Sequence, residues 1–342
     1  MSVRILIGDA RERLRELPAA SVQCAVTSPP YWRQRDYGVA GQIGLELTPE
    51  EYVERLREIF AEVRRVVRDD GTLWLNIGDK WAADTKWGGS TGGKHVAALH
   101  GQVNGMRGRV STGLKDKDLV GVPWMLAFAL RADGWFLRQC NIWAKPNCMP
   151  ESVTDRSTIS HEYVFHLSKS GDYFYDIDAA RTPFTPSSET RLAQNVDAQE
   201  SSARGNGGRK TNGPMKAVQH SDKQRGHTRR HQGFNERWDA MERTAQVGSG
   251  ANLRSVWWIA PSTDPESHFA MMPAALAEIC IVSASRPGDT ILDPFGGAGT
   301  TGLVADRLKR NAILIELNPA YAAMAERRIA KDAGMFADVS AA

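Results

Sequence analysis

The amino-acid sequence predicts an α/β fold built on a mostly parallel sheet. Apolar strands alternate with amphipathic helices from the N-terminus onward, which is typical of helices that cross between parallel strands. A glycine-rich turn, Asp293–Thr301, joins a short apolar strand to a helix, and Ser28-Pro29-Pro30-Tyr31 directly follows another strand. Open parallel sheets bind ligands at the carboxyl ends of their strands. Both turns are therefore candidates for a ligand site.

The first part of the chain gives clear local signals. Apolar runs predict strands at 3–7, 22–27 and 72–77. Thr48 is the predicted N-cap of a long helix, with Pro49 at its first position and Glu51 completing a capping box. Asp69-Asp70-Gly71 is predicted to end that helix.

Later elements are interrupted by two long polar stretches. Strands are predicted at 135–144, 162–167, 256–259, 290–292 and 312–315, helices at 123–132 and 273–285, and a hairpin return at 172–176. Residues 82–118 are rich in glycine and indicate a long mobile loop, a type of segment that is often a lid or a binding element. Residues 183–255 show little periodicity.

Bulk composition is that of a globular protein of ordinary type. The 342 residues are 42% hydrophobic and 24% charged. No apolar run approaches a membrane span, and the N-terminus lacks the layout of a secretory signal. The four cysteines form no CxxC pair, so we expect neither a zinc knuckle nor a disulfide framework, and a reducing cytoplasm is the expected location.

Positive charge is concentrated in one stretch. Residues 204–231 hold eight Lys and Arg against one acid, Asp222, a net charge of +7, whereas the whole chain carries +3. A basic, glycine-rich insert on an otherwise mildly acidic protein predicts a polyanion partner. A solvated loop without a partner is the alternative.

Ser28-Pro29-Pro30-Tyr31 is a turn rich in hydrogen-bond acceptors. Its prolines remove two N–H donors and keep Ser28 out of helical geometry. The Ser28 hydroxyl and nearby carbonyls remain as acceptors, and Tyr31 adds a flat aromatic face. Acceptors that hold both hydrogens of an exocyclic amine draw its nitrogen toward a reactive tetrahedral geometry, while the ring stacks on an extruded base. A plain strand-ending turn is the alternative for this motif alone.

Asp293–Thr301 has the form of a nucleoside-cofactor turn. Glycines between a strand and a helix let a ligand approach the main chain closely. Glu316, at the end of the next apolar strand, is placed to bind ribose hydroxyls. A dinucleotide turn is the rival, but it requires a small residue for close helix–strand packing, and here Thr300 and Thr301 follow Gly299 directly.

Together, these two motifs resemble those of the amino-group DNA methyltransferases that use S-adenosylmethionine. The (S/D/N)PP(Y/F/W) motif precedes FxGxG, an order similar to that of the permuted β class. The resemblance covers residues 1–80, 119–180 and 256–330. It implies a Rossmann-like methyltransferase fold, with helices on both faces of a mostly parallel seven-stranded sheet in circularly permuted order.

The resemblance also implies three parts. Residues 1–182 form the catalytic half, which includes the 82–118 loop. Residues 183–255 form a target-recognition insert, and residues 256–342 form the cofactor-binding half. The motif order further implies that the strand at Ile291 lies centrally, beside the strand that ends at Ser28.

Carried over position by position, the resemblance assigns two sets of residues. The target base is taken by Ser28, Pro29, Pro30 and Tyr31. Cofactor contacts are expected from Asp9, His268, Phe269, Ala270, Pro273, Asp293, Phe295, Gly297, Gly299, Thr300, Thr301, Glu316, Leu317 and Asn318. DNA contacts are expected from Trp32, because it adjoins the base site, and from Arg225, Arg229 and Arg230 in the 183–255 segment, and no metal is expected. In this scheme Glu316 holds the ribose and Asp9 reaches the adenine amino group, with helix capping as the alternative for either acid.

The implied activity is site-specific transfer of a methyl group from S-adenosylmethionine to N4 of a flipped-out cytosine. In the resembled family Ser at the first motif position goes mainly with cytosine and Asp mainly with adenine, so N6-adenine is the alternative. No Pro-Cys dipeptide occurs, which argues against carbon-5 methylation through a cysteine nucleophile. Activity on RNA or protein, or a non-catalytic DNA-binding module, are further alternatives.

The expected partner is double-stranded DNA. A monomer or homodimer in a prokaryotic cytoplasm, associated with the nucleoid, fits this activity. A cognate restriction endonuclease acting separately is a possible companion.

Overall fold

The computed structural model describes residues 1–82, 114–115, 117–148, 150–188, 250–262, 271–334 and 338–342. The chain divides into two compact units. The first contains residues 1–176 and 254–342, and the second contains residues 177–253. The predicted site residues that the structure describes all belong to the first unit.

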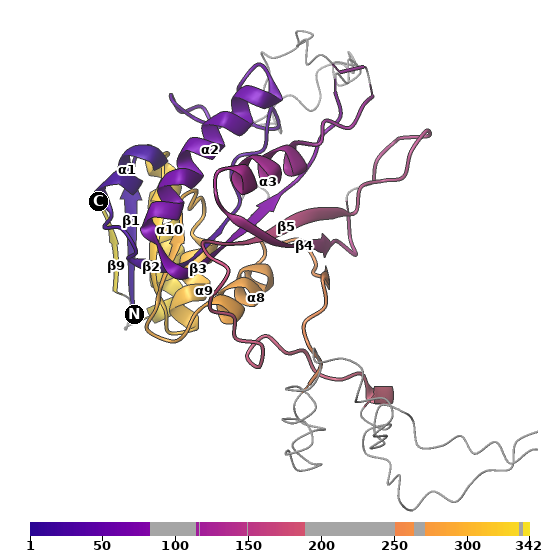
Figure 1. Ribbon diagram of the computed structural model, residues 1–342. Coiled ribbons are helices and arrows are strands. Elements are labelled where there is room, and N and C mark those ends of the chain that lie inside the picture. Colours follow the sequence, from indigo (N-terminus) through magenta and orange to yellow (C-terminus); the bar gives the residue numbers. More distant parts are fainter. Residues whose placement is uncertain (83–113, 116, 149, 189–249, 263–270, 335–337) are drawn as a thin grey trace, which may run out of the picture. The chain divides into compact units, whose positions relative to one another are not determined.

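A mixed sheet forms the centre of the first unit (Figure 1). Its strands are β1 (Ser2–Ile7), β2 (Val22–Thr27), β3 (Val67–Ile77), β4 (Phe136–Ala144), β5 (His161–Ser168), β6 (Val256–Trp258), β7 (Thr290–Asp293), β8 (Asn311–Glu316) and β9 (Asp338–Ala341). Their order is β6-β4-β5-β3-β2-β7-β8-β1-β9. Only β5 runs antiparallel to its neighbours among the described strands. The predicted number of seven strands is too low, because nine strands pair in the described part of the chain.

Helices cover both faces of this sheet. They are α1 (Ala10–Glu16), α2 (Pro49–Val66), α3 (Val122–Ala132), α8 (Ala274–Ala284), α9 (Thr300–Arg307) and α10 (Pro319–Ala333). α1, α2 and α3 pack side by side over one face, and α8, α9 and α10 over the other (Figure 1). β2 is buried along its whole length, as expected for a strand covered on both faces.

The boundary between α2 and β3 differs from the prediction. The capping box is confirmed: Thr48 accepts from the Glu51 amide, and the Glu51 side chain accepts from the Thr48 amide. However, the helix ends at Val66, and β3 begins at once with Val67, which pairs with Val22. Sheet pairing therefore overrides the Asp-Asp-Gly stop signal.

The predicted return strand at 172–176 is wrong. These residues have no strand conformation. Two of their tyrosine rings, Tyr173 and Tyr175, instead contact the ring of His166 on β5. The alternating aromatic residues that predicted a strand are thus explained by packing of two tyrosine side chains against β5.

The centre of the sheet confirms the permuted order. β2 pairs in parallel with β7, with Cys24 opposite Ile291 and Ala25 opposite Leu292. The carboxyl end of β2 leads into Ser28, and that of β7 leads into the glycine-rich turn. The two motifs therefore meet at one edge of the sheet although they are far apart in sequence.

Two bridges close the stems of the predicted loops. Trp81 pairs with Leu119 in the first unit, and Thr182 pairs with Ala251 in the second. Most of the predicted 82–118 loop and most of the predicted 183–255 insert lie outside the described residues. Among the described helices, none is both long and apolar enough to cross a membrane.

Candidate active site

A cavity of about 340 Å³ opens at the carboxyl edge of the central strands. Both predicted turns line it, with Ser28–Tyr31 on one side and Asp293–Ala298 on the other. Glu316, Leu317 and Asn318 add the end of β8. The sheet thus assembles one continuous site from both ends of the chain.

Asp293 joins three segments at the floor of the cavity. Its Oδ1 accepts from Thr27 Oγ1 at 2.6 Å and from the Phe295 amide at 3.0 Å, and its Oδ2 accepts from Thr301 Oγ1 at 2.7 Å. The residue is 4% exposed. Burial raises the pKa of Asp293 above its ordinary value, and the two hydroxyls and the amide oppose that shift. Asp293 therefore ties β2, the turn and α9 together.

The glycine-rich turn requires its glycines. Gly297 and Gly299 have positive φ angles of 49° and 77°. A Cβ on Gly299 would lie 2.7 Å from Ala325 Cβ on α10. A Cβ on Gly297 would have Phe295 O at 3.9 Å as its nearest neighbour, so the turn is open there to a ligand.

Gly302 is the small residue that was predicted to be missing from this turn and to distinguish it from a dinucleotide-binding turn. A Cβ on Gly302 would lie 2.8 Å from Leu314 Cδ1, so this residue provides the close helix–strand packing of the third glycine in such turns. Thr300 and Thr301 therefore do not separate the two kinds of turn. The choice between cofactors rests on the other half of the cavity and on related proteins.

Glu316 links the turn to the start of α10. Its Oε2 accepts from the Gly297 amide at 2.7 Å, and its Oε1 accepts from the Asn318 amide at 2.8 Å. Burial raises the pKa of Glu316, while these backbone donors oppose the shift. The carboxylate is thus held at the cavity wall, and its expected role as a ribose ligand stays a prediction.

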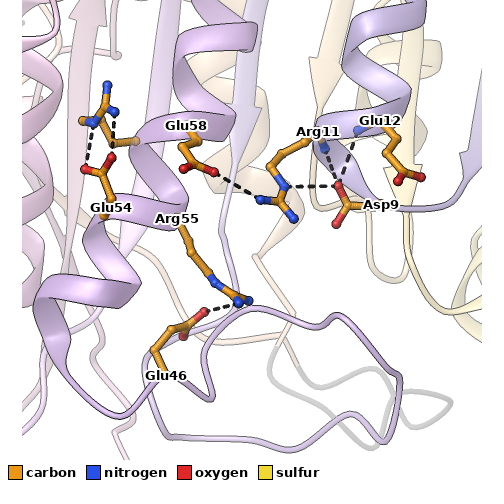
Figure 2. A network of polar contacts seen from close by, with 8 residues as sticks. Asp9, Arg11, Glu12, Glu46, Glu54, Arg55 and Glu58 are labelled. Carbon is orange, nitrogen blue, oxygen red and sulfur yellow. Dashed lines mark hydrogen bonds and ion pairs between the residues drawn. The ribbon is translucent and has the colours of Figure 1, made fainter.

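Asp9 lines the cavity but also caps α1 (Figure 2). Its Oδ1 accepts from the Arg11 amide at 2.8 Å and lies 3.4 Å from the Glu12 amide. Arg11 in turn forms an ion pair with Glu58 on α2. The helix-capping alternative is therefore present in the structure, and the expected contact with an adenine amino group stays a prediction.

The Ser28–Trp32 turn is held in place by contacts with Tyr52, Gly78 and Glu46. Tyr52 Oη on α2 donates to Pro30 O at 2.8 Å. Gly78 leaves room for the Tyr31 ring, since a Cβ there would lie 2.8 Å from Tyr31 Cε2. Trp32 is 4% exposed, and its indole N–H donates to Glu46 O. Its predicted contact with DNA gains no support from this buried position.

The Tyr31 hydroxyl lies in a group of polar side chains from β3, from β5 and from the residue directly after β4. It donates to Glu162 Oε2 at 2.5 Å and accepts from Asn76 Nδ2 at 2.8 Å. Lys145 Nζ lies 2.5 Å from Glu162 Oε1. Burial, reinforced by the Glu162 charge, raises the pKa of Tyr31 well above its usual value. The phenol therefore stays protonated and keeps its hydrogen bond to Glu162.

A group of cavity residues lies outside the predicted motifs and was missed: Tyr37, Asn76, Trp143, Lys145, Glu162, Met271, Met272, Tyr321 and Met324. Asn76 and Trp143 lie near the carboxyl ends of predicted strands, and this position was the available signal. Glu162 lies at the start of an antiparallel strand, whose first residues reach the same edge. That strand had no predicted site role.

Some predicted residues lie outside the described part of the chain, namely His268, Phe269, Ala270, Arg225, Arg229 and Arg230. Pro273 is described and caps α8 without a side-chain hydrogen bond. Roles predicted for these residues remain predictions.

Comparison with known proteins decides the family. A family model described as DNA methylase matches residues 22–327. The chain belongs to this DNA methylase family. The Type II methyltransferase M.SmaI of Serratia marcescens is 41% identical over 328 residues, covering 96% of this chain and 91% of the relative. M.XycI of Xanthomonas campestris pv. cyanopsidis is 40% identical over 322 residues, covering 94% and 86%.

Solved structures share the fold of this DNA methylase. TTHA0409 of Thermus thermophilus, in complex with S-adenosyl-L-methionine, superposes with a TM-score of 0.55 at 24% identity and covers 99% of each chain. The PvuII DNA methyltransferase (cytosine-N4-specific) gives a TM-score of 0.57 at 18% identity, covering 100% of this chain and 95% of the other.

S-adenosylmethionine is the expected cofactor of the DNA methylase, and TTHA0409, which shares the fold, is solved in complex with it. When bound, it supplies a methyl group carried on a cationic sulfur. The cavity fits such a group, because the turn at Gly297 is open and the Glu316 carboxylate stands beside it. The other half of the cavity, around Ser28, remains for the group that accepts the methyl.

Proposed function

We propose that this DNA methylase modifies N4 of cytosine at a specific DNA sequence, with the target base flipped out of the duplex. The arrangement of Ser28, Tyr31 and Asn76 at the cavity carries the proposal. Ser28 Oγ lies 3.5 Å from Tyr31 Oη and 3.3 Å from Asn76 Nδ2. A base entering the cavity would thus meet a neutral hydroxyl, held by its neighbours, at the end of β2.

An exocyclic amine suits this group of side chains because it brings two N–H donors. The Ser28 hydroxyl and the backbone carbonyls of the Pro-Pro turn are acceptors for those hydrogens. Asn76 Oδ1 is also buried, and no hydrogen-bond partner is found for it among the described residues. Acceptors on both hydrogens weaken conjugation of the nitrogen lone pair with the ring and orient that lone pair for transfer.

Two observations favour cytosine over adenine. Ser rather than Asp stands first in the motif, as in the cytosine enzymes that the sequence resembles, and a protein described as cytosine-N4-specific shares the fold. N6-adenine is the second candidate.

Nucleoside analysis tests this choice. Mixed-sequence DNA from a host without its own methylases is incubated with the protein and S-adenosylmethionine, then digested to nucleosides and measured by mass spectrometry. We expect N4-methylcytosine, and an initial rate about 100-fold lower from the Ser28→Ala protein under the same conditions. Methyl on adenine alone would contradict the cytosine proposal while leaving the family assignment intact.

Recognition of the DNA sequence is proposed for residues 183–255, with Arg225, Arg229 and Arg230 as contacts to phosphates or guanines. The charge of residues 204–231 supports this assignment, because a phosphate backbone attracts a basic segment. Replacement of the three arginines by glutamine should weaken DNA binding at low salt and leave cofactor affinity unchanged.

A further inference from the structure

A line of polar side chains connects the acceptor turn to an ion pair between Lys145 and Glu162, both of which line the cavity. Ser28 Oγ lies 3.5 Å from Tyr31 Oη, and Tyr31 Oη lies 2.5 Å from Glu162 Oε2. Lys145 Nζ lies 2.5 Å from the second Glu162 oxygen. The side chains of this ion pair are 21% and 15% exposed for Lys145 and Glu162, so solvent screens the pair only partly.

Glu162 determines the direction of these hydrogen bonds. As the ion-pair partner of Lys145 it is a carboxylate, which only accepts hydrogen bonds. Tyr31 must therefore give its hydrogen to Glu162, and its oxygen offers only lone pairs on the side of Ser28. The Ser28 hydroxyl consequently donates toward Tyr31. Asn76 Nδ2 donates to Ser28 Oγ at 3.3 Å, so one lone pair of the hydroxyl is left for a substrate donor.

Asn76 receives its orientation from the same carboxylate. Its Nδ2 donates to Glu162 Oε2 at 2.9 Å and to Tyr31 Oη at 2.8 Å. A flipped amide would place Oδ1 against the carboxylate, which is repulsive. Because Asn76 is 3% exposed, water offers little compensation for the wrong orientation. Glu162 thus acts on Ser28 by two routes, through Tyr31 and through Asn76.

We propose that Glu162 is a positioning residue that makes the Ser28 hydroxyl an acceptor for the target amine. The inference rests on the proposed function, since it concerns the amine that this site would methylate. A glutamine at this position has an N–H₂ group that can donate to Tyr31 Oη. Tyr31 would then be free to donate to Ser28, and the Ser28 hydrogen would point at the incoming amine. The amine would lose an acceptor and meet a donor.

The test is Glu162→Gln, measured by steady-state methylation of DNA together with cofactor binding by calorimetry. We expect kcat to fall by about 10- to 100-fold, while the KM for DNA and the cofactor Kd change by less than about threefold. Glu62→Gln is the matched control. It breaks an ion pair with Arg65 on α2, at 2.8 Å, and does not line the cavity, so kcat should be unchanged.

A double-mutant cycle separates positioning from other roles. If Glu162 acts through Ser28, Glu162→Gln causes no further loss of kcat in the Ser28→Ala protein. An equal loss in both backgrounds would overturn the proposal, and so would a single variant that keeps more than half of the wild-type kcat. A wild-type protein that methylates no DNA would instead refute the proposed function.

Tyr31→Phe is a second test of the proposal, for the case that the Glu162→Gln protein does not fold. It removes the linking oxygen and leaves the Glu162–Lys145 pair in place. We expect a loss of kcat similar to that of Glu162→Gln, with an unchanged unfolding temperature and cofactor Kd. Full activity of Tyr31→Phe would overturn the proposal.

Discussion

The cofactor side and the acceptor side of the cavity are built in different ways. On the cofactor side, the Glu316 carboxylate is held by backbone amides, and Asp293 is held by two hydroxyls and an amide. On the acceptor side, side chains from β3, from β5 and from the residue directly after β4 hold one another, and Tyr31 lies between Asn76 and Glu162. The Glu316 contacts are set by the path of the main chain, and the Asp293 contacts by that path together with two threonine side chains. The acceptor side depends on the chemical identity of each side-chain partner.

This difference predicts how each side responds to mutation. Removing the Asp293 carboxylate on the cofactor side leaves an amide and two hydroxyl donors without an acceptor, so stability and cofactor affinity should change together. Conservative changes on the acceptor side keep the shape and alter only the direction of hydrogen bonds, so turnover should change alone.

The largest effect is expected for Asp293→Ala. The change removes the acceptor of Thr27, Phe295 and Thr301 in a buried position, so we expect a loss of about 3–5 kcal/mol in the free energy of unfolding. Cofactor affinity and turnover should fall as well. Chemical unfolding measures the free energy of unfolding, and calorimetry measures the cofactor affinity. Asp293→Asn keeps one acceptor and the volume, so it should lose less than half as much. A loss below about 1 kcal/mol for Asp293→Ala would contradict the role of Asp293 in linking β2, the turn and α9.

The second effect concerns pH and the strands that carry the acceptor side. His166 on β5 stacks on Trp74 of β3 at 4.2 Å between ring centroids, and burial lowers its pKa to about 3. Its neutral form stabilises the fold above the unfolded-state pKa of about 6.5, and this contribution is lost as pH falls toward 3. We expect a loss of about 3 kcal/mol by pH 4 from this group. His166→Phe should remove that part of the pH dependence of the free energy of unfolding, measured by chemical unfolding. If the variant shows the same pH dependence as wild type, the role assigned to His166 is refuted.

Ser28→Ala should separate the two sides most clearly. We expect turnover to fall about 100-fold, equivalent to about 2.7 kcal/mol, because one acceptor for the amine is lost. Cofactor Kd should stay within about twofold, since Ser28 is not held by the glycine-rich turn. Ser21→Ala, which changes an exposed serine away from the cavity, is the control. Loss of cofactor binding by Ser28→Ala would contradict the division between the two sides.

The smallest effect is expected for Glu316→Gln, and it should separate affinity from stability. Cofactor affinity should fall about tenfold, or about 1.4 kcal/mol, through weaker ribose contacts. Burial raises the pKa of Glu316, so its contribution to stability is present below the unfolded-state pKa and is lost as pH rises through the folded-state pKa. At pH 7 the glutamine variant without cofactor should therefore be at least as stable as wild type. Calorimetry and unfolding at pH 4.5 and 7 test this, and a stability loss equal to the affinity loss would contradict it.

One part of the fold followed from local chemistry alone. The Thr48 capping box and the start of α2 were predicted at the correct residues because the signals lie within one helical turn. The pairing of β2 with β7 was predicted from the order of two distant motifs and from the family that they resemble. In contrast, the early start of β3 at Val67 depends on pairing with Val22, a partner that no local pattern reveals.

By itself, the sequence determined the α/β class, because apolar strands alternate with amphipathic helices along the chain. It also determined the two turns, whose backbone geometry glycine and proline impose over a few residues, and the order of these motifs implied the edge at which they meet. Only the tertiary structure decided what surrounds the Tyr31 hydroxyl. Asn76 and Glu162 lie on separate strands, and Lys145 directly follows a third. The antiparallel direction of β5 brings its first residues to the carboxyl edge of the parallel strands. A single acid in a strand carries no sequence signal of such a role, since its function arises from neighbours that only the pairing of the sheet supplies.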